Sequence, residues 1–280
     1  MKRFKWLPLL LAIPLCLSAC GNDSGISEKQ QELKKQGMEL QASGNYEAAI
    51  AKYEEALGLS SMEVGKEEID LAYYKASAQY RSGDLDGAID TYSAILAVKK
   101  SEDSYLGRGL LYVAAGEEKK AEEDLKKVLK ETKDPLTMGI IYNVTGDTAK
   151  AKECFEKAQK DGDSEAIFYL ASIYDESGDH NYAMLLLEEY IAGGKAGAEG
   201  YLSVAREYFD DGRYDEALEM VQAGIALGDF GVMPSLLTEE IACYEKLGDF
   251  ATAKEKVQAY LEIYPEDAVM EKEYEFLKSR

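Results

Sequence analysis

Side chains that catalyse reactions or hold metal ions are scarce in this chain, and those present form no recognisable motif. The sequence has one histidine, His180, and four cysteines, Cys16, Cys20, Cys154 and Cys243. A single histidine excludes a histidine-rich zinc site, and no serine or cysteine stands in the sequence context of an activated nucleophile. We therefore predict that the protein is not an enzyme and holds no metal ion.

The sequence also lacks the motifs that bind common cofactors. Segment 161–165 (Asp-Gly-Asp-Ser-Glu) superficially resembles a calcium loop, but the glycine at loop position six and the glutamate at position twelve are missing. We interpret it as a linker that caps the next helix. The sequence contains no Gly-rich phosphate loop, no H-E-x-x-H and no C-x-x-C. No cofactor is predicted.

The main feature of the sequence is a pattern that occurs seven times, and the elements it predicts must position the other side chains. Each copy has a glycine, an alanine five residues later and an apolar residue nine residues later, and five copies have a tyrosine four residues before the glycine. The glycines are Gly44, Gly83, Gly116, Gly146, Gly178, Gly212 and Gly248. The alanines are Ala49, Ala88, Ala121, Ala151, Ala183, Ala217 and Ala253. The apolar residues are Tyr53, Tyr92, Leu125, Phe155, Leu187, Val221 and Val257. The tyrosines are Tyr112, Tyr142, Tyr174, Tyr208 and Tyr244.

This pattern predicts seven pairs of helices joined by tight turns. Apolar residues recur with helical periodicity on both sides of each glycine, and glycine adopts the positive φ of such a turn at low cost. The small alanine lets the second helix approach the first closely. One hairpin cannot bury both of its faces, so the hairpins must stack on one another. His180 stands where other copies have Tyr46, Tyr214 and Phe250, and we predict that it packs against its neighbours.

The glycine spacing of 30 to 39 residues resembles that of the tetratricopeptide repeat (TPR) family. The best copies are Leu33–Leu57, Tyr201–Ile225 and Leu237–Leu261, the last followed by a proline, Pro265, at the family's position. Glycine linkers after copies four to six are similar to those of Sel1-like repeats. The resemblance implies an all-α, right-handed α-solenoid of about seven repeats over residues 28–264, with a capping helix over 265–280. The family's motif residues serve packing, so the resemblance does not identify a ligand.

The amino terminus has the features of an export signal. Lys2, Arg3 and Lys5 precede an apolar run over 6–17, which is too short for a membrane span. The residues around Cys20 (Leu-Ser-Ala-Cys-Gly) resemble a bacterial lipobox, in which the cysteine is acylated and becomes the first mature residue. The resemblance implies a lipoprotein whose signal peptide is 1–19 and whose lipidated tether is 20–27. Its place would be the extracytoplasmic face of a bacterial membrane, cytoplasmic or outer.

The chain is strongly acidic. Its net charge is −21, and removal of Lys2, Arg3 and Lys5 with the signal peptide makes it −24. Such a polyanion repels nucleic acid, so we expect no nucleic-acid partner. The charge favours a cationic partner, but acidic residues that merely solvate the outer faces of seven hairpins would give the same composition. Cys154 and Cys243 lie in different repeats, and we expect free, buried thiols and no disulfide.

The family resemblance also indicates where a ligand would bind. In TPR proteins the first helix of each repeat lines a concave groove. The matching residues here are Tyr73, Tyr80, Leu106, Leu110, Val113, Leu136, Ile140, Phe168, Leu202, Arg206 and Phe209. Acidic residues beside them are Asp70, Asp103, Glu165, Asp175 and Glu199. An apolar groove with an acidic rim suits a peptide with hydrophobic and basic residues.

We therefore expect a membrane-anchored scaffold that binds a protein or peptide through this groove. The alternative is a structural assembly factor of an envelope, secretion or pilus complex, which would use the convex face or the ends. An envelope hydrolase is the third and weakest alternative. The carboxylate clamp of chaperone-binding family members is not supported, because only Lys34 fits among the matching positions, the others being Met38, Tyr74, Asp103 and Gly107.

Overall fold

The computed structural model describes residues 28–59, 64–265 and 267–279, and within these ranges every element is a helix. The proposed signal peptide, Cys20 and the tether lie outside the described residues. The chain divides after Ala151 into two compact units, and each unit is described by itself. The all-α repeat architecture predicted from the sequence is confirmed.

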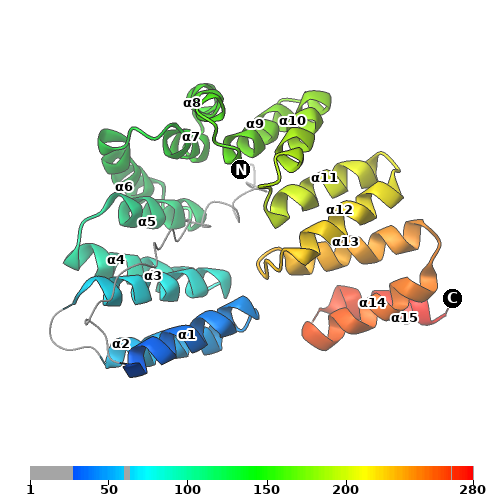
Figure 1. The fold of residues 1–280 in the computed structure, drawn as a ribbon, viewed down its shortest axis with the longest axis horizontal. Coiled ribbons are helices and arrows are strands. Elements are labelled where there is room, and N and C mark those ends of the chain that lie inside the picture. The colour runs from blue at the N-terminus through cyan, green and yellow to red at the C-terminus, as the bar shows by residue number, and fades with distance from the viewer. Residues whose placement is uncertain (1–27, 60–63, 266, 280) are drawn as a thin grey trace. The chain divides into compact units, whose positions relative to one another are not determined.

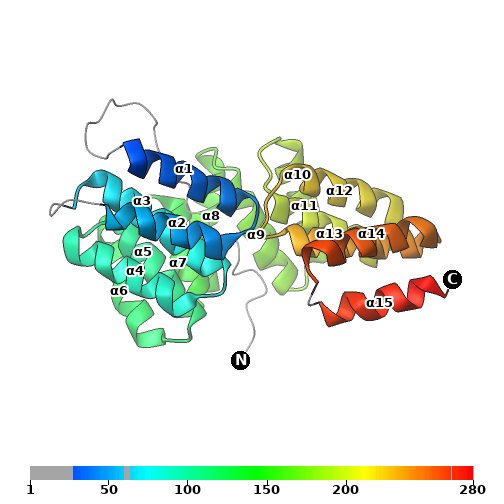
Figure 2. The same cartoon turned by 90° about the horizontal axis from the view of Figure 1, so that it is seen from below.

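Unit one is a stack of helical hairpins in chain order (Figures 1 and 2). Its helices are α1 (Glu28–Ala42), α2 (Tyr46–Gly58), α3 (Lys66–Arg81), α4 (Leu85–Val98), α5 (Glu102–Ala114), α6 (Glu118–Glu131) and α7 (Pro135–Val144). Each helix from α1 to α6 packs against the next, and α1 also contacts α3. Helix α8 (Thr148–Lys160) runs across the boundary between the units.

Unit two repeats the same arrangement (Figure 1). Its helices are α9 (Glu165–Glu176), α10 (His180–Ala192), α11 (Ala198–Asp210), α12 (Tyr214–Ala226), α13 (Met233–Lys246), α14 (Phe250–Ile263) and α15 (Ala268–Lys278). Consecutive helices pack against each other, and α11 also contacts α13. We call the odd-numbered helices from α1 to α13 the A helices, and number the repeats by them, so that repeat three is α5 and α6.

The predicted turns lie where expected. All seven turn glycines have a positive φ, between 73° and 90°, which only glycine adopts without strain. The residue after the glycine then caps the second helix in several copies. Asn45, Asp84, Asp179 and Asp249 each accept a hydrogen bond from a backbone amide in the first helical turn. In each turn, three residues separate the end of one helix from the start of the next.

The core consists of the residues that the repeat pattern identified. All seven alanines and all seven apolar residues of the pattern are buried. The pattern tyrosines are half-buried, apart from Tyr112, which is buried. Four of the five rings lie under a cation that belongs to the second helix of a hairpin or to the residue that caps it. These pairs are Tyr112 with Lys120, Tyr142 with Lys150, Tyr174 with Lys152 and Tyr208 with Arg213, at 3.9–5.2 Å from the ring centroid. The tyrosines thus shield the turn end of the core while remaining partly hydrated.

Helix α15 covers the end of unit two. Asp267 caps it by accepting from the amides of Val269 and Met270, and also accepts a hydrogen bond from the Tyr260 hydroxyl at 2.9 Å. Leu277 is buried against α14, whereas Val269 is exposed among the charged residues of the outer side. In the part of the chain that the structure describes, no helix has the length and apolarity needed to span a membrane.

Candidate peptide-binding surface

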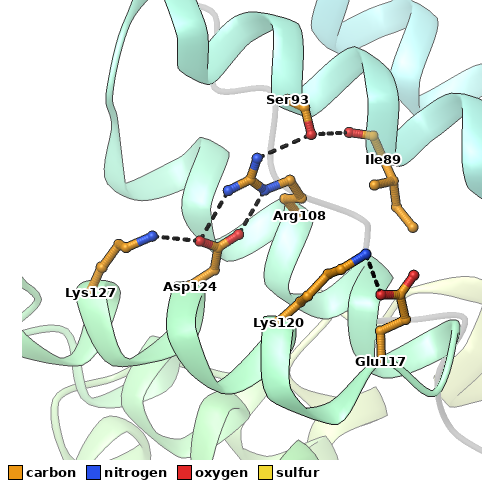
Figure 3. A network of polar contacts seen from close by, with 7 residues as sticks. All are labelled: Ile89, Ser93, Arg108, Glu117, Lys120, Asp124 and Lys127. Atoms are coloured by element: carbon orange, nitrogen blue, oxygen red, sulfur yellow. Dashed lines mark hydrogen bonds and ion pairs between the residues drawn. The ribbon is translucent and has the colours of Figure 1, made fainter.

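A buried ion pair fixes the A helix of repeat three in unit one (Figure 3). Arg108 of α5 donates to both carboxylate oxygens of Asp124 in α6, at 2.7 and 3.1 Å, and to Ser93 Oγ of α4 at 3.0 Å. Lys127 adds a bond of 2.8 Å to Asp124 Oδ1. The hydrogen bond with Asp124 raises the pKa of the Arg108 guanidinium. Three helices are therefore held in register by one satisfied network.

Repeat seven, in unit two, has a second ion pair, of which only the carboxylate is buried. Lys256 of α14 donates to Glu240 Oε1 of α13 at 2.9 Å, and only 2% of Glu240 is exposed. The second carboxylate oxygen, Oε2, is buried without a hydrogen-bond partner among the described residues. Sequence reasoning missed both pairs. A signal was available in the sequence. In each pair one residue lies eight positions before the turn glycine, and a residue of opposite charge lies eight positions after it.

Three of the predicted groove residues are core residues. Leu110, Phe168 and Leu202 are no more than 2% exposed. The ring of Phe168, in α9, packs near two other aromatic rings. Its centroid lies 6.1 Å from that of Tyr169 and 5.7 Å from that of Tyr190. A bound partner could not touch these three side chains without opening the core, so we exclude them from the candidate surface.

In unit one the six other groove residues are half-buried on the A helices. They are Tyr73, Tyr80, Leu106, Val113, Leu136 and Ile140. The Tyr73 hydroxyl of α3 is within 3.2 Å of Ser101 Oγ and 2.5 Å of Ser104 Oγ at the start of α5. Tyr73 therefore joins repeats two and three, and only the remaining face of its ring is open to a partner.

In unit two the accessible groove residues are Arg206 and Phe209. Arg206 Nε lies 3.4 Å from Glu239 Oε2, which links α11 to α13. Phe209 is half-buried, meets the ring of Tyr214 edge-on at 5.2 Å, and lies 5.9 Å from Lys246 Nζ. Both residues lie on one A helix.

One position of the A helices carries a carboxylate in four repeats. We call it the acidic position, thirteen residues before the turn glycine: Asp70 and Asp103 in unit one, Glu165 and Glu199 in unit two. Within the described ranges, none of the four lies within ion-pair distance of a cation. Burial raises the pKa of Glu165 and of Glu199, in the first case with help from Asp163. The charge of Arg206 acts in the opposite direction on the pKa of Glu199, but Arg206 forms its ion pair with Glu239.

His180 does not pack as predicted. Its side chain is 66% exposed, and Nδ1 lies 2.5 Å from Asp175 Oδ1. The hydrogen bond with Asp175 is the main reason that the pKa of His180 is raised. The rings of Tyr174 and Tyr182, on either side of this turn, meet edge-on with their centroids 4.5 Å apart. The predicted acidic-rim residue Asp175 is therefore already paired.

The two cysteines in the described part of the chain are free thiols, as predicted, but only Cys243 is buried as expected. Cys243 is buried in α13, and burial, followed by the nearby Glu239 and Glu240, raises the pKa of its thiol to about 12. Cys154 is only half-buried, and burial raises the pKa of its thiol as well. Such thiols are poor nucleophiles. They give no reason to propose a catalytic centre.

Stacked two-helix repeats define a class of helical repeat protein, and sequence comparison identifies its family. A tetratricopeptide repeat model matches residues 34–105, 75–135 and 204–268, and a second one matches 136–160. The chain belongs to the tetratricopeptide repeat family. No curated protein gave a sequence match.

Solved structures agree with this assignment at the level of the fold. A tetratricopeptide repeat protein from Parabacteroides merdae is 16% identical, with a TM-score of 0.52 over 90% of this chain and 100% of that chain. PilF of Pseudomonas aeruginosa is 15% identical, with a TM-score of 0.50 over 76% of this chain and 97% of its own. Identities this low establish similarity of architecture alone. Function must therefore be argued from the residues of this chain.

Proposed function

We propose that this protein is a lipid-anchored scaffold of the bacterial cell envelope that binds a protein or peptide along its A helices. The partner is basic and partly hydrophobic. Binding involves several weak contacts on successive repeats, and the anchor raises the effective concentration of the scaffold near other envelope proteins. No step of this function requires a cofactor or a catalytic residue.

The observation that carries the proposal is the acidic position on the A helices. Asp70, Asp103, Glu165 and Glu199 have no ion-pair partner among the described residues, although many other carboxylates of the chain do. Half-buried apolar side chains such as Leu106 and Val113 lie on the same helices as these carboxylates. Unpaired carboxylates beside apolar side chains favour a partner that carries Lys or Arg next to hydrophobic residues, because such a partner supplies both counter-charge and apolar area.

Site-specific photocrosslinking in living cells tests which face of the repeats binds. A photoreactive residue at Val113, on A helix α5, is expected to capture a partner. The matched control position is Glu123, which is exposed on α6. Adducts from Val113 alone support the proposal, and an Asp103→Lys substitution should reduce their yield. Adducts from Glu123 alone would contradict it and would favour an assembly factor that uses the opposite face.

The lipid anchor is tested at Cys20. The Cys20→Ser protein is expected to lose incorporation of labelled palmitate and to move from the membrane fraction to the soluble fraction. The matched control is Cys16→Ser, which changes a cysteine inside the proposed signal peptide and should leave acylation unchanged. Membrane association that survives Cys20→Ser would show that the protein is held there by another contact.

A further inference from the structure

The start of α9 brings two carboxylates and two tyrosines of unit two together. The Glu165 amide donates to Asp163 Oδ1 at 2.9 Å, so that both carboxylates stand at the helix N-terminus. Tyr169 follows one turn later, and Tyr190 comes from the end of α10. After burial, the charge of Glu165 and then that of Asp163 raise the pKa of Tyr190, and both carboxylates also raise the pKa of Tyr169. The four groups therefore share one electrostatic environment.

The aromatic side chains of this site are fixed by their neighbours. Phe155 stacks on Tyr169, with centroids 4.8 Å apart and an interplanar angle of 6°. The Tyr190 hydroxyl accepts a hydrogen bond from the Gly197 amide at 3.2 Å. Its ring lies against Gly200 of α11, where a Cβ would come within 2.6 Å of the ring. Helices α9, α10 and α11 thus build one rigid wall beside Glu165.

The Tyr169 hydroxyl is the second observation that points to a ligand. Only 5% of Tyr169 is exposed, and its hydroxyl makes no hydrogen bond of normal geometry in the described structure, although it lies beside the Glu165 carboxylate. A buried phenol normally has a hydrogen-bond partner, because leaving its hydroxyl unsatisfied destabilises the folded state. Glu165 itself is half-buried, and within the described ranges no cation pairs with it. Within the described ranges the chain thus supplies no cation for Glu165, and the Tyr169 hydroxyl beside it has no hydrogen bond of normal geometry.

We propose that this site holds the basic side chain, lysine or arginine, of a peptide bound along the A helices of unit two. The cation donates hydrogen bonds to the carboxylates of Glu165 and Asp163. Glu165, held in place by the cation, then accepts a hydrogen bond from the Tyr169 hydroxyl, and Tyr169 acts as a positioning residue. The inference rests on the proposed function, since it names the residue type that the scaffold recognises in repeat five.

The test is a titration of the isotope-labelled mature chain, followed by amide NMR. The probe is N-acetyl-lysine N-methylamide, with the arginine counterpart in parallel. We expect saturable shifts of the Glu165, Tyr169 and Gly197 amide signals at millimolar probe concentrations, as befits a single-residue ligand. The uncharged norleucine counterpart should produce no shift at these positions.

Two substitutions separate recognition from folding. Glu165→Gln keeps the shape of the side chain and should weaken binding at least tenfold. Tyr169→Phe keeps the aromatic packing and should weaken binding less, because it removes only the supporting hydrogen bond. Glu176→Gln, at the exposed far end of α9, is the matched control and should leave binding unchanged.

Absence of saturable shifts, or equal affinity of Glu165→Gln and the unsubstituted chain, would overturn the inference. That result would leave the proposed function intact, because crosslinking at Val113 probes unit one and does not depend on Glu165. Saturable binding of the lysine probe without crosslinks from Val113 would have the opposite meaning. It would support the cation site and remove the evidence for a partner on the A helices of unit one.

Discussion

Repeats three and seven place an ion pair with a buried carboxylate at the same two positions but exchange the charges. In repeat three the cation, Arg108, is on the A helix and the anion is Asp124; in repeat seven the anion, Glu240, is on the A helix and the cation is Lys256. Repeats five and six have apolar residues there, namely Leu170 with Leu186 and Val204 with Met220. The packing of a hairpin thus tolerates either charge order, or none.

The two pairs differ in how completely their polar atoms are satisfied. Both Asp124 oxygens accept hydrogen bonds from Arg108, and Oδ1 also accepts from Lys127. Glu240 has one bonded oxygen and one buried oxygen without a partner among the described residues. The planar guanidinium can serve both oxygens at once, whereas the ammonium of Lys256 is a single point charge. Removing the anion should therefore cost more in repeat three than in repeat seven.

The largest effect is expected for Asp124→Ala. It leaves the Arg108 guanidinium, whose side chain is 19% exposed, without its counter-charge. Loss of one partner of a buried pair costs about 3–5 kcal/mol, and we expect a decrease of that size in the free energy of unfolding. Urea denaturation followed by far-ultraviolet circular dichroism measures it. Glu117→Ala, which breaks the exposed Lys120 pair shown in Figure 3, is the control and should cause no measurable change. A small loss for Asp124→Ala would mean that Arg108 finds water or another acceptor.

A smaller effect is expected for Glu240→Ala in repeat seven. Lys256 is 40% exposed and can turn toward water, so its charge is not stranded. We expect a loss of about 1–2 kcal/mol, the typical cost of one charge-assisted hydrogen bond offset by relief of the unsatisfied oxygen. Glu240→Met imitates the apolar repeats and should be neutral or stabilising. If Glu240→Met destabilises as much as Asp124→Ala does, the proposed difference between the repeats is wrong.

The fold was predictable from sequence because it depends on spacing. The turn glycines and buried alanines recur at fixed distances, and the helix boundaries follow from them within a few residues. The start of α3 shows the limit. The apolar residues before Gly83 recur from Ile69 onward and predict a helix that begins there. The helix in fact begins at Lys66, where the Glu68 carboxylate accepts a hydrogen bond from the Gly65 amide. A local cap of this kind has no counterpart in the repeat pattern.

The candidate surface was less predictable, because burial depends on neighbouring repeats. The family pattern assigned Leu110, Phe168 and Leu202 to the groove, but adjacent helices cover them. For Phe168 the sequence did contain a warning. Residues 166–173 are all buried, and they form a nearly continuous apolar run in α9. A helical segment that is apolar on all sides has no free face, and in α9 this applies to 166–173 but not to Glu165. The pairing of His180 with Asp175 left no signal of comparable strength.

A third prediction uses Cys243 to report on the interior of repeat seven. Its thiol is buried beside Glu240, and the pKa of about 12 leaves very little thiolate at about pH 8. Iodoacetamide should therefore label Cys154 first and Cys243 only through local opening of α13. Mass spectrometry of peptides over time gives both rates. Glu240→Ala should accelerate labelling of Cys243, whereas Asp124→Ala, in the other unit, should affect it less. Equal acceleration by both would show that the two units open together.

The smallest effect is expected for the ion pair of His180 with Asp175, because the His180 side chain is exposed to water. Its pKa is raised above the ordinary value of 6.5, first by the hydrogen bond with Asp175 and then by the charge of Asp175. Protonated histidine is therefore favoured in the folded state. The stabilisation is complete below pH 6.5 and disappears as the pH rises through the folded-state pKa. The difference in urea midpoint between the unsubstituted chain and His180→Ala should be measurable in mild acid and vanish at mildly alkaline pH. Asp175→Asn should remove the same pH dependence, since it deletes the partner but not the imidazole. A midpoint difference that grows with pH would contradict the assignment, because it would require a histidine that is stabilised in its neutral form.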